Sequence, residues 1–363
     1  MIWRISGFFL ALMVSVLRVQ AATEYLYGIG TDWNLYQLSV NKGASTVVST
    51  KFGNLSGYVS GFGTHQNEYI NGLAIDPATG NIFFNYSYNA NTSASTGPLT
   101  VVPYVYQNKN GAYIAPYALG AAITSSTLPL TTVSSGYLPR SAYYNGAYWL
   151  GVQNSDTLVQ LPITGTTSLS YTGVNQFSNF DHSATTTLGG GDFVIGSNDV
   201  IYGSTVLSSA NTFFRQQISN ATNVASGASW TNFNIDSSIP FATQGSIQVA
   251  GLGQSASSDL YVVSSTGRNV YLVNGNDDST APTFTQIGSS GVVPITMTDL
   301  SIIVTAPLPV PETSTKMGGG LLVVAGTVEG WRRFRRPKGR IRPCPGMTVV
   351  PEPTRSSVST GRA

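Results

Sequence analysis

The sequence is poor in charge. Asp, Glu, Lys and Arg together make up 9% of its 363 residues, whereas soluble domains usually carry about 25%. Helix-rich enzymes use many Glu, Lys, Arg and Ala, so this scarcity argues against an all-α protein and against a Rossmann-type fold. Hydrophobic residues make up 42% and aromatic residues 11% of the chain. That share can bury a sizeable core, which excludes wholesale disorder.

Cysteine and histidine are scarcer still. The single cysteine, Cys344, lies in a basic C-terminal tail, so the body before it has no disulfide, thiolate metal site or cysteine nucleophile. The two histidines, His65 and His182, stand 117 positions apart and lack any metal-ligand spacing. No Gly-x-Ser-x-Gly elbow and no phosphate-binding glycine loop is present. We therefore expect neither a metal nor another cofactor.

Glycine and tyrosine are abundant instead, with 39 and 19 copies. Together with plentiful Ser, Thr and Asn, they are typical of an all-β, turn-rich exported protein. The charges divide along the chain: residues 23–308 carry six cations and thirteen carboxylates, and residues 309–363 carry ten cations and three carboxylates. A sparse, acidic body lacks the clustered Lys and Arg that bind phosphate backbones, so nucleic-acid binding is disfavoured.

The first 22 residues have the pattern of a secretory signal peptide. Arg4 supplies the positive start, residues 5–17 the apolar run, and Val19-Gln20-Ala21 a small-residue cleavage pattern. An apolar run of this length is shorter than the ~20 residues that span a bilayer. An amphipathic first helix of the fold is the alternative. We expect the mature protein to begin near residue 23 and to be exported.

The segment 309–336 contains three ordered elements: a Pro-Glu motif, an apolar run over residues 321–328, and an arginine cluster. The motif and the cluster consist of Val310, Pro311, Glu312, Thr313, Ser314, Thr315, Arg332, Arg333, Arg335 and Arg336. This segment resembles the PEP-CTERM sorting signal of Gram-negative bacteria. The resemblance implies transient inner-membrane anchoring, with the arginines on the cytoplasmic side, and cleavage by an exosortase-type protease. It also implies association with exopolysaccharide or biofilm material.

The segment departs from the family pattern in three ways. Thr313 replaces the second proline, and the chain continues through a basic tail, residues 337–363, that we expect to be disordered. The apolar stretch 317–328 contains four glycines and ends at Glu329, so at ~1.5 Å per helical residue it falls short of the ~30 Å hydrocarbon core. Two interpretations stay open, a working sorting signal and a basic tail without sorting.

Short apolar phrases recur between residues 23 and 308. The phrase that starts each repeat falls at Leu73, Ala142, Phe193, Ile247 and Leu300, with spacings of 69, 51, 54 and 53 residues. Its last copy, 299–304, supplies the partner that is missing before Tyr25. A circularly displaced strand closes a β-propeller and leaves no open sheet edge. We predict five four-stranded blades, with an insertion near residues 85–97 in the long second blade. Six or seven blades and β-sandwiches are the alternatives.

Carboxylates at the starts of innermost strands are the catalytic candidates. Such strands converge on the channel of a propeller, and Asp192, Asp299 and Glu68 occupy or precede this position in three repeats. They could act as general acid and base in a glycosidase or lyase, where the separation between carboxylates decides the stereochemical outcome. The alternative, which we prefer, is that each Asp caps a turn or accepts hydrogen bonds from neighbouring strand amides.

Six tyrosines gather in the predicted second blade beside Asn- and Ser-rich loops: Tyr86, Tyr88, Tyr104, Tyr106, Tyr113 and Tyr117. Tyr and Asn combine flat apolar contact with hydrogen bonding, as a neutral glycan surface requires. Blade packing would explain the same residues. The sequence thus predicts an exported, non-catalytic envelope or matrix protein that binds polysaccharide through these loops. A propeller glycosidase or lyase and a scaffold that presents loops to protein partners are the alternatives.

Overall fold

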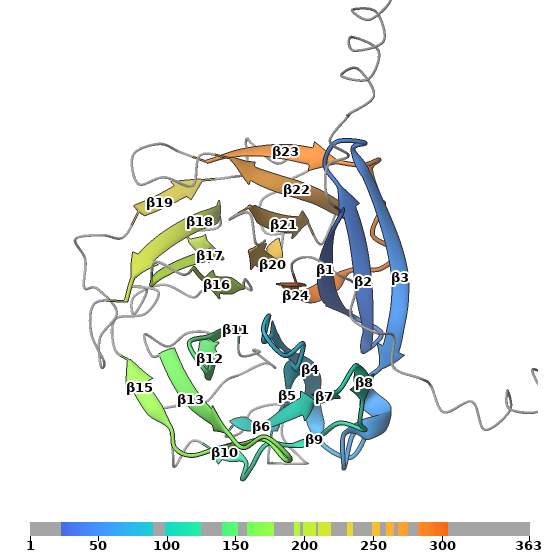
Figure 1. The fold of residues 1–363 in the computed structure, drawn as a ribbon. Helices are drawn as coiled ribbons and strands as arrows, with labels where there is room; N and C mark the ends of the chain where they lie inside the picture. The colour runs from blue at the N-terminus through green and yellow to red at the C-terminus, as the bar shows by residue number, and fades with distance from the viewer. Residues whose placement is uncertain are drawn as a thin grey trace, which may run out of the picture. The chain divides into compact units, whose positions relative to one another are not determined.

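The computed structural model describes residues 23–89, 99–124, 140–151, 158–177, 192–196, 199–207, 210–218, 231–234, 249–254, 259–264, 268–274 and 282–303. Within these residues the chain forms five antiparallel sheets around one axis (Figure 1). One 3-10 turn, Ser56–Tyr58, is the sole helical element there, and no described helix has the length and apolarity to cross a membrane. The prediction of a five-bladed β-propeller is confirmed.

The strands of each blade lie in order from the axis outwards. The first blade contains β24 (Met297–Ile303), β1 (Thr23–Gly30), β2 (Asn34–Asn41) and β3 (Thr46–Asn54). The second contains β4 (Gln66–Ile75), β5 (Ile82–Asn89), β6 (Leu99–Tyr106) and β10 (Ile123–Thr124), with β9 (Tyr117–Ala118) also paired to β6. The third contains β11 (Arg140–Tyr144), β12 (Ala147–Gly151), β13 (Leu158–Thr164) and β14 (Ser170–Tyr171), with β15 (Asn175–Phe177) also paired to β13.

The last two blades have the same simple order. The fourth contains β16 (Phe193–Ile195), β17 (Val200–Leu207), β18 (Ala210–Gln217) and β19 (Thr231–Asn234). The fifth contains β20 (Val249–Gln254), β21 (Leu260–Ser264), β22 (Asn269–Asn274) and β23 (Thr283–Ile287). A separate hairpin, β7 (Asn108–Lys109) with β8 (Ala112–Tyr113), follows β6.

The first blade is shared by the two ends of the propeller. The C-terminal strand β24 pairs antiparallel with the N-terminal strand β1, with Leu26 opposite Ile302 and Gly28 opposite Leu300. Because the strand that completes the ring comes from the far end of the chain, no blade is left without its inner strand. The prediction that a strand near 299–304 closes the propeller is confirmed.

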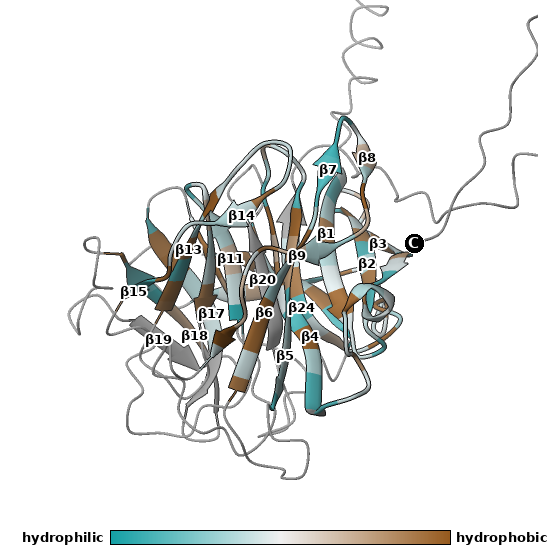
Figure 2. Ribbon diagram, turned by 90° about the horizontal axis from the view of Figure 1, so that it is seen from below, coloured by the Kyte–Doolittle hydropathy of each residue, from teal (hydrophilic) through white to brown (hydrophobic). Residues whose placement is uncertain are grey.

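The hydrophobic core is divided among the gaps between blades. Five buried clusters fill the five gaps: one joins Phe84 of β5 to Tyr27 of β1, and another joins Trp149 of β12 to Phe214 of β18. Apolar residues, brown in Figure 2, recur along the strands of successive blades. Each blade packs against a neighbour on both faces. The sequences of its strands are therefore nearly continuous apolar runs rather than alternating apolar and polar residues.

Of the insertion predicted near residues 85–97, only residues 85–89 lie within the described part of the chain. Residues 85–89, predicted as part of an insertion, belong to β5, where Asn85 pairs with Pro103 of β6. Phe84 and Tyr86 face the first blade, and Asn85 alternates with them, which is the period of a strand. The second blade also has additional residues after β6, which include the β7–β8 hairpin and the short strands β9 and β10.

Candidate functional site

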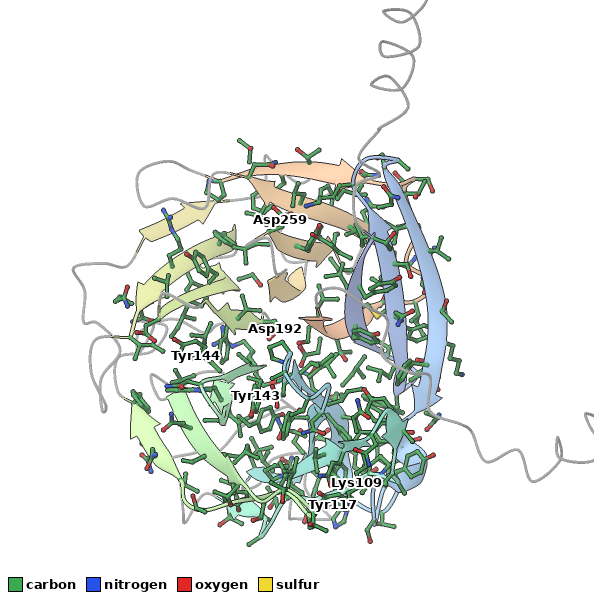
Figure 3. All side chains as sticks on the ribbon, in the orientation of Figure 1. Lys109, Tyr117, Tyr143, Tyr144, Asp192 and Asp259 are labelled. Carbon is green, nitrogen blue, oxygen red and sulfur yellow. The ribbon has the colours of Figure 1, made fainter. Side chains whose placement is uncertain are left out.

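Two of the three predicted carboxylates meet at the axis of the propeller. Asp192 directly precedes β16 in the fourth blade, and Asp299 lies in β24 of the first blade. Their side chains are hydrogen-bonded to each other, and each residue is only 1% exposed. The first and fourth blades are not neighbours in the ring, so this contact crosses the axis. Figure 3 shows Asp192 near the centre of the molecule.

Backbone amides of the inner strands surround this pair, which we call the axial acid pair. Leu300 N–H lies 2.7 Å from Asp299 Oδ1 and 3.2 Å from Asp192 Oδ2. Leu73 N–H of β4 donates to Asp299 Oδ2 at 2.6 Å, and Phe193 N–H donates to Asp192 Oδ1 at 2.8 Å. The Ser141 N–H of β11 also donates to Asp192. The pair therefore binds the inner strands of four blades.

The axial acid pair is protonated more readily than ordinary aspartates. Burial raises the pKa of Asp192 to about 6, although hydrogen bonds from Asp299 and the strand amides oppose this rise. Burial, followed by the charge of Asp192, raises the pKa of Asp299 well above its usual value. Two carboxylates in contact away from water cannot both be charged without a large cost, so one of them keeps a proton.

Polar groups from the second and third blades complete the surroundings of the pair. The Tyr148 hydroxyl of β12 is fully buried and donates to the Gly72 carbonyl of β4. Burial raises the pKa of Tyr148, and the charges of the axial acid pair raise it further, so it stays neutral. Gly72 has φ +69°, and a Cβ there would overlap Asn85 Nδ2 and lie 3.0 Å from Tyr148 Oη. Glycine is required at this position because its φ is positive and because a Cβ would have no room.

The third predicted carboxylate, Glu68, has a separate set of partners. The N–H groups of Gly63, Thr64 and His65 donate to it at 2.5, 3.0 and 2.7 Å, and the Tyr86 hydroxyl donates at 2.8 Å. Burial alone would raise the pKa of Glu68, but these hydrogen bonds outweigh it and hold the pKa below its usual value. Glu68 thus fixes the loop before β4, and these donors are distinct from those that bind the axial acid pair.

The six predicted tyrosines do not form one exposed surface. Tyr86, Tyr104 and Tyr106 are buried in the core between the first and second blades. Tyr88, Tyr113 and Tyr117 are half-buried. The Tyr113 hydroxyl donates to the Gly80 carbonyl at 2.7 Å, and the Tyr117 hydroxyl donates to Gln107 Oε1 at 2.8 Å. Blade packing accounts for most of this cluster, because the aromatic rings fill the gap between two twisted sheets.

Two of these tyrosines, Tyr86 and Tyr88, belong to a continuous cluster of rings at the junction of the first two blades. The ring array, as we call it, comprises Trp33, Phe62, His65, Tyr69, Tyr86 and Tyr88. His65 lies over Tyr88, with ring centroids 4.0 Å apart, and Trp33 contacts Phe62 and Tyr69 edge-on at 5.8 and 6.1 Å. Five of the six rings are half-buried, with Tyr86 buried among them.

Local polar contacts hold the ring array in place. His65 Nδ1 lies 3.1 Å from the Tyr86 hydroxyl and 3.4 Å from Glu68 Oε1. Trp33 has φ +61°, a conformation that bulky residues rarely adopt. The preceding Asp32 carboxylate supports this turn by accepting hydrogen bonds from Asn34 N–H at 3.2 Å and from the Tyr36 hydroxyl at 2.8 Å. Trp33, Phe62 and Tyr69 were not among the predicted residues, because they come from separate segments that no local pattern connects.

Metal ligands do not gather in the described part of the chain. No group of three His, Cys, Asp or Glu side chains there is placed to hold a metal ion. His182, the predicted signal peptide and the predicted sorting segment lie outside the described residues.

The chain matches no family model and no curated protein. Among solved structures it resembles a catalytically inactive variant of virginiamycin B lyase from Staphylococcus aureus, with quinupristin, at 11% identity over 75% of this chain and 86% of the other, with a TM-score of 0.34. It also resembles the periplasmic gluconolactonase of Pseudomonas aeruginosa at 9% identity over 78% and 100% of the two chains, with a TM-score of 0.37. At these values neither enzyme's activity transfers to this chain.

Proposed function

We propose that this protein is an exported, non-catalytic β-propeller of the envelope or extracellular matrix, which binds an uncharged polysaccharide at the ring array. The observation that carries the proposal is the contrast between the two sites. The axial carboxylates are 1% exposed and accept hydrogen bonds from strand amides, so a substrate has no access to them. The ring array keeps half-buried aromatic side chains at the junction of two blades.

The composition of the ring array supports an uncharged sugar as the ligand. Aromatic rings contact the apolar faces of sugar rings, and neighbouring polar groups such as the His65 imidazole form hydrogen bonds with hydroxyl groups. The nearest carboxylates, Asp32 and Glu68, both have pKa values held below the usual range. They are therefore charged at neutral pH, and an anionic polymer would be repelled.

Export and sorting belong to the same proposal. The resemblance of residues 1–22 to a signal peptide and of 309–336 to a PEP-CTERM segment supports delivery through the inner membrane, with an exosortase-type protease as partner. The propeller ends with β24 at Ile303, so a cut near Glu312 would leave every described strand in the released protein.

Affinity electrophoresis tests the binding. The mature propeller should migrate more slowly in gels that contain a neutral polysaccharide such as dextran, galactomannan or xyloglucan, and should not be retarded by alginate. Tyr88→Ala removes the ring that stacks on His65 and should weaken binding by roughly tenfold, as expected for one aromatic contact of about 1.5 kcal/mol. Tyr171→Ala, a half-buried tyrosine of the third blade, is the matched control and should bind normally.

Two results would contradict the proposal in different ways. Equal mobility with and without every neutral polysaccharide would remove the binding role and favour a scaffold for protein partners. Release of new reducing ends or unsaturated sugars from any of these polymers by the pure protein would show that it is an enzyme.

A further inference from the structure

The axial acid pair has a geometry that goes beyond the proposed binding function. Both residues are almost completely buried, and the pair joins two blades that are not neighbours. The amides that donate to it come from four blades, through Leu300, Leu73, Ser141 and Phe193. Opening the contact between the two carboxyl groups would therefore disturb the inner strands of most of the ring at once.

We propose that a single proton shared by Asp192 and Asp299 fastens the inner strands at the axis, and that loss of this proton at alkaline pH loosens the propeller. With the proton present, one carboxyl group donates to the other, and the amide donors stabilise the single negative charge that remains. Without it, two negative charges lie in contact in a site that water does not reach. Their repulsion pushes the first and fourth blades apart.

The surroundings of the pair contain few other ionisable groups that could take over this role. Tyr148 of β12 faces the pair and is neutral because burial raises its pKa. Arg140 precedes Ser141 on β11 and is buried. The inner strands β16 and β20 have no ionisable residue in their sequences, β24 has only Asp299, and the sole acidic residue of β4, Glu68, is bonded within its own loop.

The direction of the pH effect follows from the raised pKa values. An unfolded aspartate has a pKa of about 3.9, so above about pH 4 the folded chain retains a proton that the unfolded chain has lost. This contribution to stability is complete on the acid side and is lost as the pH rises through the folded pKa of the last proton on the pair. That proton belongs to Asp299, whose pKa burial and the charge of Asp192 raise well above its usual value. In the pH window between the unfolded and the folded pKa, each rise of one pH unit should raise the unfolding equilibrium constant about tenfold for one such proton.

Urea unfolding of the mature propeller between about pH 5 and about pH 8 tests the proposal, with the unfolding constant as the readout. The constant of the native protein should rise by at least about tenfold more than those of Asp299→Asn and Asp192→Asn, whose single carboxyl group has no acidic partner. Asp32→Asn is the matched control. Its carboxylate has a lowered pKa and titrates below the window, so the native pH dependence should remain.

Infrared spectroscopy of the native protein gives a second readout that does not require a folded variant. A carbonyl stretch of a protonated carboxyl group, shifted by deuteration, should persist at neutral pH and disappear under alkaline conditions. Absence of this band at neutral pH, or an equal pH dependence of stability in the native protein and both variants, would overturn the proposal. A urea midpoint that rises with added Ca²⁺ and falls with a chelator would also overturn it, because the pair would then hold a cation.

Discussion

A chain that ends at Thr296 is expected to show no cooperative unfolding transition. This truncation removes β24, and with it the pairing of residues 25–30 of β1. It also removes Met297 and Leu300, each at most 1% exposed, and burial of each contributes about 1.5–3 kcal/mol. The axial acid pair loses Asp299 and the Leu300 amide. The sum approaches the whole stability of a typical domain, about 5–15 kcal/mol.

A chain that ends at Leu308 is the matched control, since it keeps β24 and removes only residues that follow the last described strand. Its urea midpoint, followed by tryptophan fluorescence, should equal that of a chain ending at Glu312. Cooperative unfolding of the chain that ends at Thr296, with a similar midpoint, would mean that β24 does not close the ring.

Gly72→Ala is expected to lower the free energy of unfolding by about 2–5 kcal/mol, because two separate costs add at this position. The backbone has φ +69°, which costs a residue with a Cβ about 1–2 kcal/mol. The new methyl group also overlaps Asn85 Nδ2, and overpacking costs about 1–3 kcal/mol. Asn85 is 0% exposed, so its amide cannot swing into solvent to relieve the overlap.

Gly146→Ala separates the two costs. Gly146 has a similar φ of +73°, but a Cβ there meets no atom within 4 Å, so only the backbone cost of about 1–2 kcal/mol applies. Chemical denaturation of both variants measures the difference. Equal losses in the free energy of unfolding for the two variants would contradict the tight packing of Asn85 and Tyr148 around Gly72.

The architecture could be predicted from the sequence because ring closure leaves a mark in the order of repeats. The sequence has a copy of the innermost-strand phrase at 299–304 but no counterpart before Tyr25. A closed ring explains this, because its last strand pairs with its first, and β24 occupies this place. The strands after β6 could not be predicted in the same way. β9 and β10 are two residues long each, and a pair of residues carries no periodicity. The alternation of Asn85 with aromatic residues, by contrast, does indicate a strand. Residues 85–89 could therefore have been assigned to β5 rather than to the predicted insertion.

The candidate sites were predictable only in part. The position of Asp192 and Asp299 at strand starts could be recognised, since the repeats align them. Their contact across the axis depends on how five blades converge, which no local pattern encodes. Glu68 resembled them in sequence position, yet the loop amides of residues 63–65 bind it instead. The ring array combines Trp33, Phe62 and Tyr69 from separate segments, so neither spacing nor composition brings them together.

Intact mass spectrometry of the protein from the membrane fraction and the culture supernatant of its native host tests the central claim, an exported propeller released from its anchor. We expect a secreted species that begins near Thr23 and ends near Glu312, without Arg332 and the rest of the arginine cluster. Recovery of only an unprocessed chain that still begins at Met1 and ends at Ala363 would contradict export and sorting together.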